Sequence, residues 1–192
     1  MAIAGVATRE WQGVQFPTAG TWTVDPAHTA IEFQVKHLMI AKVKGRFADF
    51  EGALTIADDP AHSSVDLKIR AASIDTRTQQ RDDHLRSPEF FDVDKYPELS
   101  FTSTAVEHEH GDDWKIRGDL TIHGVTKPVT LAIEYNGQTA DPWGGQRAFF
   151  SAETKIERED WGLTYNQALE AGGWVVGKEI KITLEVEAVL QA

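Results

Sequence analysis

The stretch "WKIRGDLTIHGVTKPVTLAIEY", residues 114–135, decides the fold class. Apolar and polar residues alternate strictly through its first half, so that one face would carry Trp114, Ile116, Gly118, Leu120 and Ile122. Alternation of this kind predicts a strand with one buried and one solvent-exposed face, which is typical of antiparallel sheets. Residues 123–128 predict a tight hairpin, because Gly124 supplies backbone freedom and Pro128 suits a strand edge.

The same period of two recurs along the chain. It is seen in "TAIEFQVKH" (29–37), "SVDLKIR" (64–70) and "EIKITLEVEAV" (179–189), with turn residues between the runs. The alternation slips by one residue between Phe47 and Phe50, which predicts a bulge near Ala48 and Asp49. About eight to nine strands are expected, and we favour a closed antiparallel barrel over a sandwich because closure leaves no bare edge.

Length and composition narrow the class of protein. With 192 residues, the chain suits one domain, expected over 21–192 after an irregular leader at 1–20. The net charge of −11 argues against nucleic acid and anionic membrane as partners. The absence of cysteine excludes disulfides, zinc–thiolate sites and thiol nucleophiles. No stretch approaches the ~20 apolar residues of a membrane span.

Residues 81–101, "RDDHLRSPEFFDVDKYPELSF", are charged at one end and aromatic at the other. Ser87 and Pro88 predict a helix start, and Tyr96-Pro97 predicts its end. We expect residues 77–96 to form one or two short helices that cover a mouth of the barrel. In this lid segment Phe90 and Phe91 would face inward, and the outward, anchoring network would contain Arg81, Asp83, His84 and Arg86.

Several motifs together resemble the YceI-like family. They are "VDPAHTAIEFQVKHLMIAKVKGRFADFEG", "SIDTRTQQRDDHLRSPEFFDVDKYPELSFTS", "GDLTIHGVTKPVTL" and "REDWGLTYN" followed by "VGKEIKITLEVEAV", spread over about 21–189. The resemblance implies a lipocalin-like antiparallel barrel that holds a polyisoprenoid or similar long-chain lipid in an apolar tunnel, without enzymatic activity. Many members carry a secretory signal and work in the periplasm, and this sequence departs from them there.

The inward faces supply the candidate ligand-binding residues. An eight-stranded barrel is either filled by its own side chains or holds one extended ligand. Small residues at inward positions, such as Gly118, Ala152 and Thr154, would leave room for a ligand. Arg81 and His84 are candidates for polar head-group contacts. The apolar candidates, with His37 among them, are Phe33, Val35, His37, Phe47, Phe90, Phe91, Phe101, Ile116, Leu120, Ile122, Leu131, Phe150, Trp161 and Trp174.

Two alternatives to a lipid-binding protein stay open: an enzyme acting on a hydrophobic substrate in the same barrel, and a filled-barrel structural or interaction module. Arg81, Asp83 and His84 could form an acid–base group, although a cluster that anchors the lid segment is the favoured interpretation. The run His108-Glu109-His110 with Asp112 and Asp113 could bind a metal, although a solvated hairpin tip is favoured. We therefore expect no metal and no cofactor, while a homodimer remains open.

The N-terminus leads to a prediction about location. "MAIAGVATREWQGVQFPTAG" lacks a basic beginning, and Arg9 and Glu10 interrupt its short apolar run, unlike a secretory signal. We expect the protein to be cytoplasmic, and fractionation of the native host checks this. A mature form outside the membrane that begins near Gly20 would show the prediction to be wrong.

Overall fold

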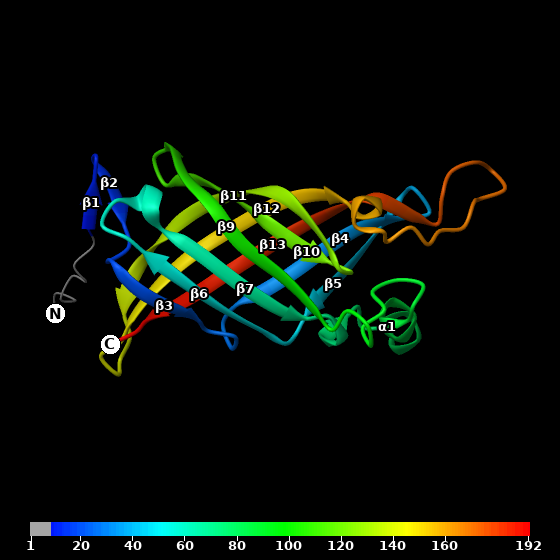
Figure 1. Ribbon diagram of the computed structural model, residues 1–192, viewed down its shortest axis with the longest axis horizontal. Helices are drawn as coiled ribbons and strands as arrows, with labels where there is room; N and C mark the ends of the chain where they lie inside the picture. The colour runs from blue at the N-terminus through cyan, green and yellow to red at the C-terminus, as the bar shows by residue number, and fades with distance from the viewer. Residues whose placement is uncertain (1–8) are drawn as a thin grey trace.

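The sheet closes on itself because its last strand pairs on both sides. The computed structural model describes residues 9–192, and its strands form a closed eight-stranded antiparallel barrel (Figure 1). Strand β13 pairs with β12 from Arg147↔Val189 to Glu157↔Glu179 and joins the two edges of the sheet. In order around the barrel the strands are β12 (Gln146–Glu157), β11 (Val125–Ala140), β10 (Asp113–Ile122), β9 (Glu98–His110), β7 (Ser64–Arg70), β6 (Phe50–Ile56), β3 (Gly20–Val24) and β13 (Val176–Leu190).

Three of the eight walls of the barrel each consist of two strands that follow one another with an interruption between them. Strand β4 (Ala30–His37) continues β3 along β13, and β5 (Ala41–Phe47) runs on into β6. The short β8 (Ile74–Asp75) continues β7 and pairs with β5. A bulge was predicted near Ala48 and Asp49, and the structure instead interrupts the strand between Phe47 and Phe50. These breaks let the same chain segments curve around the barrel and extend beyond it at one end.

The predicted hairpin and strand faces are confirmed. His123 and Gly124 join β10 to β11 as a two-residue turn with φ of 51° and 72°, the pair of positive values that a type I′ turn requires. Phe33, Leu120 and Ile182 border the interior, whereas Glu32 and Asp119 are exposed. Lys181 is partly exposed and pairs with Glu153 on the outer surface.

Gly118 has a different role from the one expected. A Cβ placed on it would lie 2.4 Å from the Phe101 ring of the neighbouring strand and 2.6 Å from the Thr102 carbonyl oxygen. The space above Gly118 is therefore filled by the Phe101 ring and is not left to a ligand. Gly45 and Phe33 are arranged in the same way, with 2.3 Å between such a Cβ and the ring. Paired glycine and aromatic residues pack in this manner on strongly curved sheets.

The described part of the expected irregular leader is ordered. Strands β1 (Arg9–Trp11) and β2 (Val14–Phe16) form a hairpin at the barrel end where the C-terminus also lies (Figure 1). Phe16 is buried, and its ring lies 4.9 Å from that of Trp114 between centroids. The hairpin thus packs onto the barrel through aromatic contacts. The remainder of that prediction, over residues 1–8, lies outside the described residues.

Helix α1 (Gln79–Arg86) lies at the opposite end, and it ends where the sequence predicted a start (Figure 1). Ser87 is the C-cap, with φ −68° and ψ 166°, and its hydroxyl donates to the His84 carbonyl. Pro88 disfavours helical geometry at Ser87, so the preceding polar run forms the helix and a series of turns follows. Short 3₁₀ helices are η1 (Pro60–His62), η2 (Ala71–Ser73) and η3 (Arg158–Trp161). Within 9–192, no helix is long and apolar enough to cross a membrane.

Candidate functional site: an apolar cavity inside the barrel

The barrel is hollow. It encloses a cavity of about 270 Å³, close to the lower end of the roughly 300–1,000 Å³ range of small-molecule sites. Its surface is almost entirely apolar and comes from the inward positions of all eight walls. A barrel filled by its own side chains, one of the open alternatives, does not describe this interior. Of the candidate residues, those that line the cavity are Phe33, Val35, Phe47, Phe90, Phe91, Phe101, Ile116, Leu120, Ile122, Leu131 and Phe150.

Three candidates lie outside the lining. The His37 ring Nδ1 is 3.1 Å from the Val175 carbonyl oxygen, so this side chain is a packed, hydrogen-bonded residue beyond the end of the cavity. Trp161 is buried and donates from Nε1 to the Leu120 carbonyl, which directs its ring against the wall. Trp174 is 44% exposed on the loop that leads into β13. Each of these aromatic rings stands near an end of a strand, where alternation no longer determines direction.

Sequence reasoning missed the aromatic end of the cavity beneath the β1–β2 hairpin. Phe16, Trp114 and Tyr135 border the cavity there. Trp114 had been placed on the correct face, but the hairpin that covers it follows no alternation long enough to be read as a strand. The contact between Phe16 and Trp114 joins positions almost one hundred residues apart. Only the closed barrel brings them together.

Polar groups border this cavity at both of its ends. Burial, together with the negative charge of Asp112, raises the pKa of Tyr135 to about 12, so its phenol stays neutral. The Tyr135 hydroxyl and the Trp114 indole N–H are buried and have no hydrogen-bond partner among the described residues. At the other end, Arg158 is 3% exposed and donates to the carbonyls of Gly177 and Leu163. Burial lowers the pKa of the Arg158 guanidinium.

The lid segment, residues 77–96, is anchored to β8 and to the residues on either side of it. The Arg86 guanidinium donates to the carbonyls of Ala72 and Ile74, each at 2.8 Å. The buried Asp82 carboxylate accepts from the backbone N–H and the hydroxyl of Thr76, at 2.9 and 2.5 Å. Arg81 Nε donates to the same hydroxyl at 2.6 Å. These bonds hold the helix in one place over the end of the barrel.

The apolar side of the lid segment faces the cavity as expected. Leu85, Phe90 and Phe91 all border the cavity, and the Phe91 ring contacts that of Phe47 edge to face at 6.0 Å. Phe90 also packs against Tyr165 of the loop before β13, with 5.1 Å between centroids. The lid segment is thus fixed to both the barrel wall and that loop. Opening this end requires these aromatic contacts to separate.

The polar candidates of the lid segment point elsewhere. His84 Nε2 lies 2.5 Å from a Glu89 carboxylate oxygen, and its ring packs against Phe90 and Tyr165. Asp83 accepts from Gln79 and Arg86, whereas Arg81 bonds to Thr76 and Thr78. Neither Arg81 nor His84 borders the cavity, so the structure does not bring them to a bound head group. Since each of the three side chains has a separate partner, the acid–base group weighed from the sequence is not assembled.

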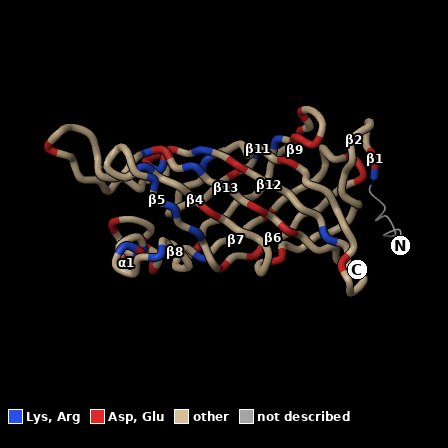
Figure 2. Tube along the Cα trace, turned by 180° about the vertical axis from the view of Figure 1, so that it is seen from behind, with Lys and Arg blue, Asp and Glu red and all other residues tan. Residues whose placement is uncertain are grey.

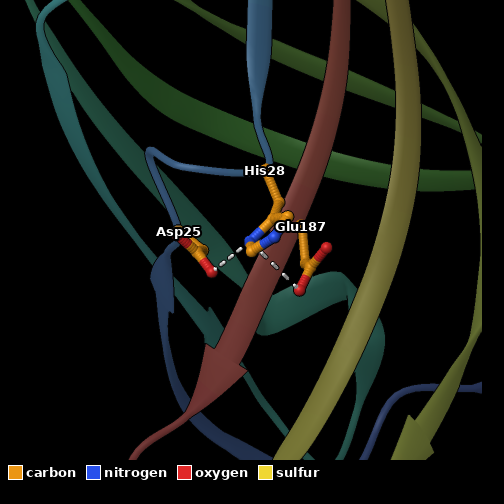
Figure 3. Close-up of side chains that lie close together, drawn as sticks. All are labelled: Asp25, His28 and Glu187. Atoms are coloured by element: carbon orange, nitrogen blue, oxygen red, sulfur yellow. Dashed lines mark hydrogen bonds and ion pairs between the residues drawn. The ribbon is translucent and has the colours of Figure 1, made fainter. Parts of the chain in front are cut away.

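One cluster of possible metal ligands forms at the other end of the barrel. Figure 3 shows His28 between Asp25 and Glu187, with its Nδ1 2.9 Å from Asp25 and 4.0 Å from Glu187. Arg147 Nη1 donates to both carboxylates, at 2.8 Å to Asp25, and its Nε donates to Asp141 at 3.1 Å. The carboxylates are therefore already neutralised by a guanidinium. We interpret the cluster as an ion-pair network that joins the loop between β3 and β4 to β12 and β13.

The two histidines of the run His108-Glu109-His110 have separate partners. His108 packs against Trp11 and Trp114 and its Nε2 lies 3.0 Å from the Gly111 carbonyl oxygen. His110 pairs with Asp113 at 2.9 Å. In the part of the chain that the structure describes, the one group of at least three metal-ligating side chains with ligand atoms within 4.8 Å is the Arg147-bound cluster above.

Comparisons of the sequence with known proteins agree with this geometry. Residues 22–188 match the model of the YceI-like domain. Protein YceI of Salmonella newport (strain SL254) is 41% identical over 165 residues, which cover 85% of this chain and 83% of the relative. Protein YceI of Salmonella arizonae has the same identity and coverage.

Solved structures share the barrel. The YCEI protein of Campylobacter jejuni is 33% identical with a TM-score of 0.70, covering 82% of this chain and 90% of that one. Burkholderia cenocepacia BcnA is 22% identical with a TM-score of 0.75, covering 85% and 98%. A polyisoprenoid binding domain from Saccharophagus degradans is 16% identical with a TM-score of 0.65, covering 88% and 98%. At their lower identity, the last two show likeness of fold.

The Arg147 network leads to a prediction about stability. Hydrogen bonds from His28 and Arg147 lower the pKa of Asp25 from 3.8 to about 2. The ionised carboxylate therefore stabilises the folded state above about pH 4, and this contribution is lost as the pH falls through about 2. Arg147→Gln should lower the melting temperature at neutral pH, and the difference from wild type should shrink toward pH 2 in thermal unfolding followed by circular dichroism.

Arg117→Gln is the matched control, because Arg117 is 58% exposed and its partner Glu107 is 45% exposed. Exposed pairs of this kind contribute little to stability, so this variant should melt close to wild type at every pH. An Arg147→Gln melting temperature equal to that of Arg117→Gln would show that the network is not a stabilising one.

Proposed function

The chain belongs to the YceI-like family, and we propose that it binds a long apolar lipid, a polyisoprenoid or similar acyl chain, inside the barrel. The observation that carries this proposal is the cavity itself: about 270 Å³ of space lined by apolar side chains and covered at one end by Phe90 and Phe91. An empty apolar cavity loses dispersion contacts that a hydrocarbon chain would restore. An apolar chain would make many dispersion contacts in this cavity, whereas a water molecule would find few hydrogen-bond partners there.

Hydrophobic transfer is sufficient for useful affinity. Each buried methylene contributes about 0.8 kcal/mol, so a five-carbon isoprene unit contributes about 3–4 kcal/mol. Three such units would contribute about 9–12 kcal/mol, which exceeds the cost of association and ordering over most of its roughly 4–15 kcal/mol range. Selectivity would then depend on the length and shape of the chain.

The comparisons support the same ligand class. The Saccharophagus degradans neighbour is described as a polyisoprenoid binding domain, and its fold covers most of this chain. The YceI relatives share 41% identity over most of the same region. Storage, sequestration or transport without catalysis, in the cytoplasm, completes the proposal. The separate hydrogen-bond partners of Arg81, Asp83 and His84 favour binding over an enzyme acting on a hydrophobic substrate.

An organic extract of the purified protein tests the proposal directly. We expect mass spectrometry to detect a co-purifying lipid with a long apolar chain, in an amount comparable to that of the protein. A folded Ala152→Phe variant controls for non-specific carry-over, because Ala152 borders the cavity and a larger side chain there would take up space that the lipid needs. Conversion of the extracted lipid on incubation with the protein would favour the enzyme, and an empty cavity that takes up no isoprenoid analogue would contradict lipid binding.

The lid segment leads to a kinetic prediction. Phe91→Ala removes an aromatic ring from the closed end of the cavity and should speed the release of a fluorescent isoprenoid analogue. The loss of about 2 kcal/mol of apolar contact corresponds to roughly thirtyfold in the off-rate. Stopped-flow fluorescence with an excess of unlabelled lipid measures this rate.

Phe149→Ala is the matched control, because Phe149 does not border the cavity whereas its neighbour Phe150 does. This variant should release the analogue at the wild-type rate. If Phe91→Ala stays folded and releases the analogue no faster than Phe149→Ala, residues 77–96 are an ordinary packed crossover.

A further inference from the structure

The tip of the β4–β5 hairpin exposes three large apolar side chains. Leu38 is 44% exposed, Met39 is 51% exposed and Ile40 is 88% exposed. Leu38 and Met39 both have positive φ values, 50° and 64°, a conformation that costs energy for residues with branched or long side chains. Folding alone gives no reason to keep these residues in such a turn. An exposed apolar group of this kind marks a site of interaction.

A second apolar side chain lies beside this tip. Trp174, in the loop that leads into β13, is 44% exposed. The two segments are joined where the Leu38 N–H donates to the Val175 carbonyl at 2.9 Å, and Met39 packs close to Gly173. Leu38, Met39, Ile40 and Trp174 together are called the apolar tip below. Figure 1 shows the hairpin and this loop projecting at the barrel end that carries α1.

Unpaired lysines surround the apolar tip. Residues 36–46 contain three lysines and one arginine and no Asp or Glu, in a chain whose net charge is −11. Lys36, Lys42 and Lys44 are exposed, and within the described part of the chain they form no ion pair. Lysines of β12 and β13, such as Lys155 and Lys181, each pair with a glutamate. Figure 2 shows Lys and Arg gathered over β4, β5 and α1.

The apolar tip lies directly beyond the end of the cavity. Val35 and Val176 border the cavity at this end. His37 pairs with Val176 in the sheet, so the tip begins one residue after the last paired position of β4. Phe90 and Tyr165 bring the lid segment and the adjoining loop into contact at the same end. A surface that binds the apolar tip would therefore lie next to the end of the cavity that the lid segment covers.

We propose that the apolar tip and the lysines around it dock the protein onto an anionic lipid bilayer. The proposal rests on the proposed lipid binding, to which it adds the surface from which the ligand enters. The apolar side chains would insert among the acyl chains while Lys36, Lys42 and Lys44 contact anionic head groups. Apolar residues flanked by lysine suit this interface and not the surface of an acidic protein, which offers no hydrocarbon layer.

The net charge of −11 argued against an anionic membrane, and the distribution of charge answers that objection. Salt screens exposed charges beyond about 8 Å at physiological ionic strength, so distant acidic residues of the barrel walls act weakly at the tip. Glu170 is the exposed acid of the neighbouring loop, and on the lid segment at the same end the exposed Asp83 and Glu89 pair with Arg86 and His84. The hairpin itself presents only basic groups over residues 36–46. A local basic surface is sufficient for such binding.

Sedimentation with vesicles tests the proposal. Wild-type protein should bind vesicles of phosphatidylglycerol and phosphatidylcholine in equal parts more tightly than vesicles of phosphatidylcholine alone, and high salt should reduce the difference. For the double variant Lys42→Ser/Lys44→Ser, the partition coefficient onto vesicles that contain phosphatidylglycerol should fall about fivefold for each lysine replaced. The Ile40→Ser variant should bind both vesicle types about tenfold more weakly than wild type, because the substitution removes an apolar contact that does not depend on lipid charge.

Two controls match these variants. Trp143 is 83% exposed in the turn between β11 and β12, at the opposite end of the barrel, and Lys68 is exposed on the wall. Trp143→Ser and Lys68→Ser should bind vesicles as wild type does. Binding of an isoprenoid analogue in solution should be unchanged in every variant, which separates docking from the proposed function. Absence of vesicle binding, equal losses in the controls, or an Ile40-dependent dimer without vesicle binding would overturn the proposal.

Discussion

Closure of the sheet through β13 is the constraint on which the remaining structure depends. This strand pairs with β12 over its length and, on its other side, with β4 and then β3. In a closed barrel every inner face looks toward one axis, so alternating apolar residues from distant segments meet across a common space. The Arg147 network joins the same strands from outside, at the break between β3 and β4. Without these pairings the inward rings would face solvent and no cavity would exist.

The two ends of the barrel are built differently. At the end near the C-terminus, the β1–β2 hairpin places Phe16 over Trp114. At the other end the walls β4, β5 and β8 extend beyond the closed part, and residues 77–96 cover the space with α1 and the turns after it. That cover is held by side-chain bonds to Thr76 and Ile74 rather than by a strand ladder. An end held in this way opens at a lower cost than one held by continuous sheet.

The proposed function rests on the interior of the barrel and on membership of the YceI-like family. Composition and charge argue against nucleic acid as a partner but do not distinguish a filled barrel from a hollow one. Glycine illustrates the difficulty: Gly118 suggested free space, yet the Phe101 ring occupies it. Free volume depends on the directions of many side chains at once, since residues of similar size fill or leave a cavity according to curvature and register. Charge shows a similar limit of composition: the net charge of the chain is strongly negative, yet residues 36–46 form a basic hairpin.

The sequence by itself determined the long alternating strands, their faces, the β10–β11 hairpin and the place of a disruption after Phe47, because these depend on neighbours within a few residues. It also identified eleven of the lining residues, since alternation assigns faces wherever a strand is long. It did not determine the end of α1 at Ser87, where the same Ser-Pro pair suits a start or a stop. Tertiary structure alone decided that Trp161 and Trp174 lie outside the cavity, that Phe16 closes it, and that Asp25, His28, Arg147 and Glu187 meet. These outcomes depend on barrel closure, which brings together residues far apart in the sequence, such as Asp25 and Arg147 at a separation of 122 positions, and no local pattern encodes such contacts.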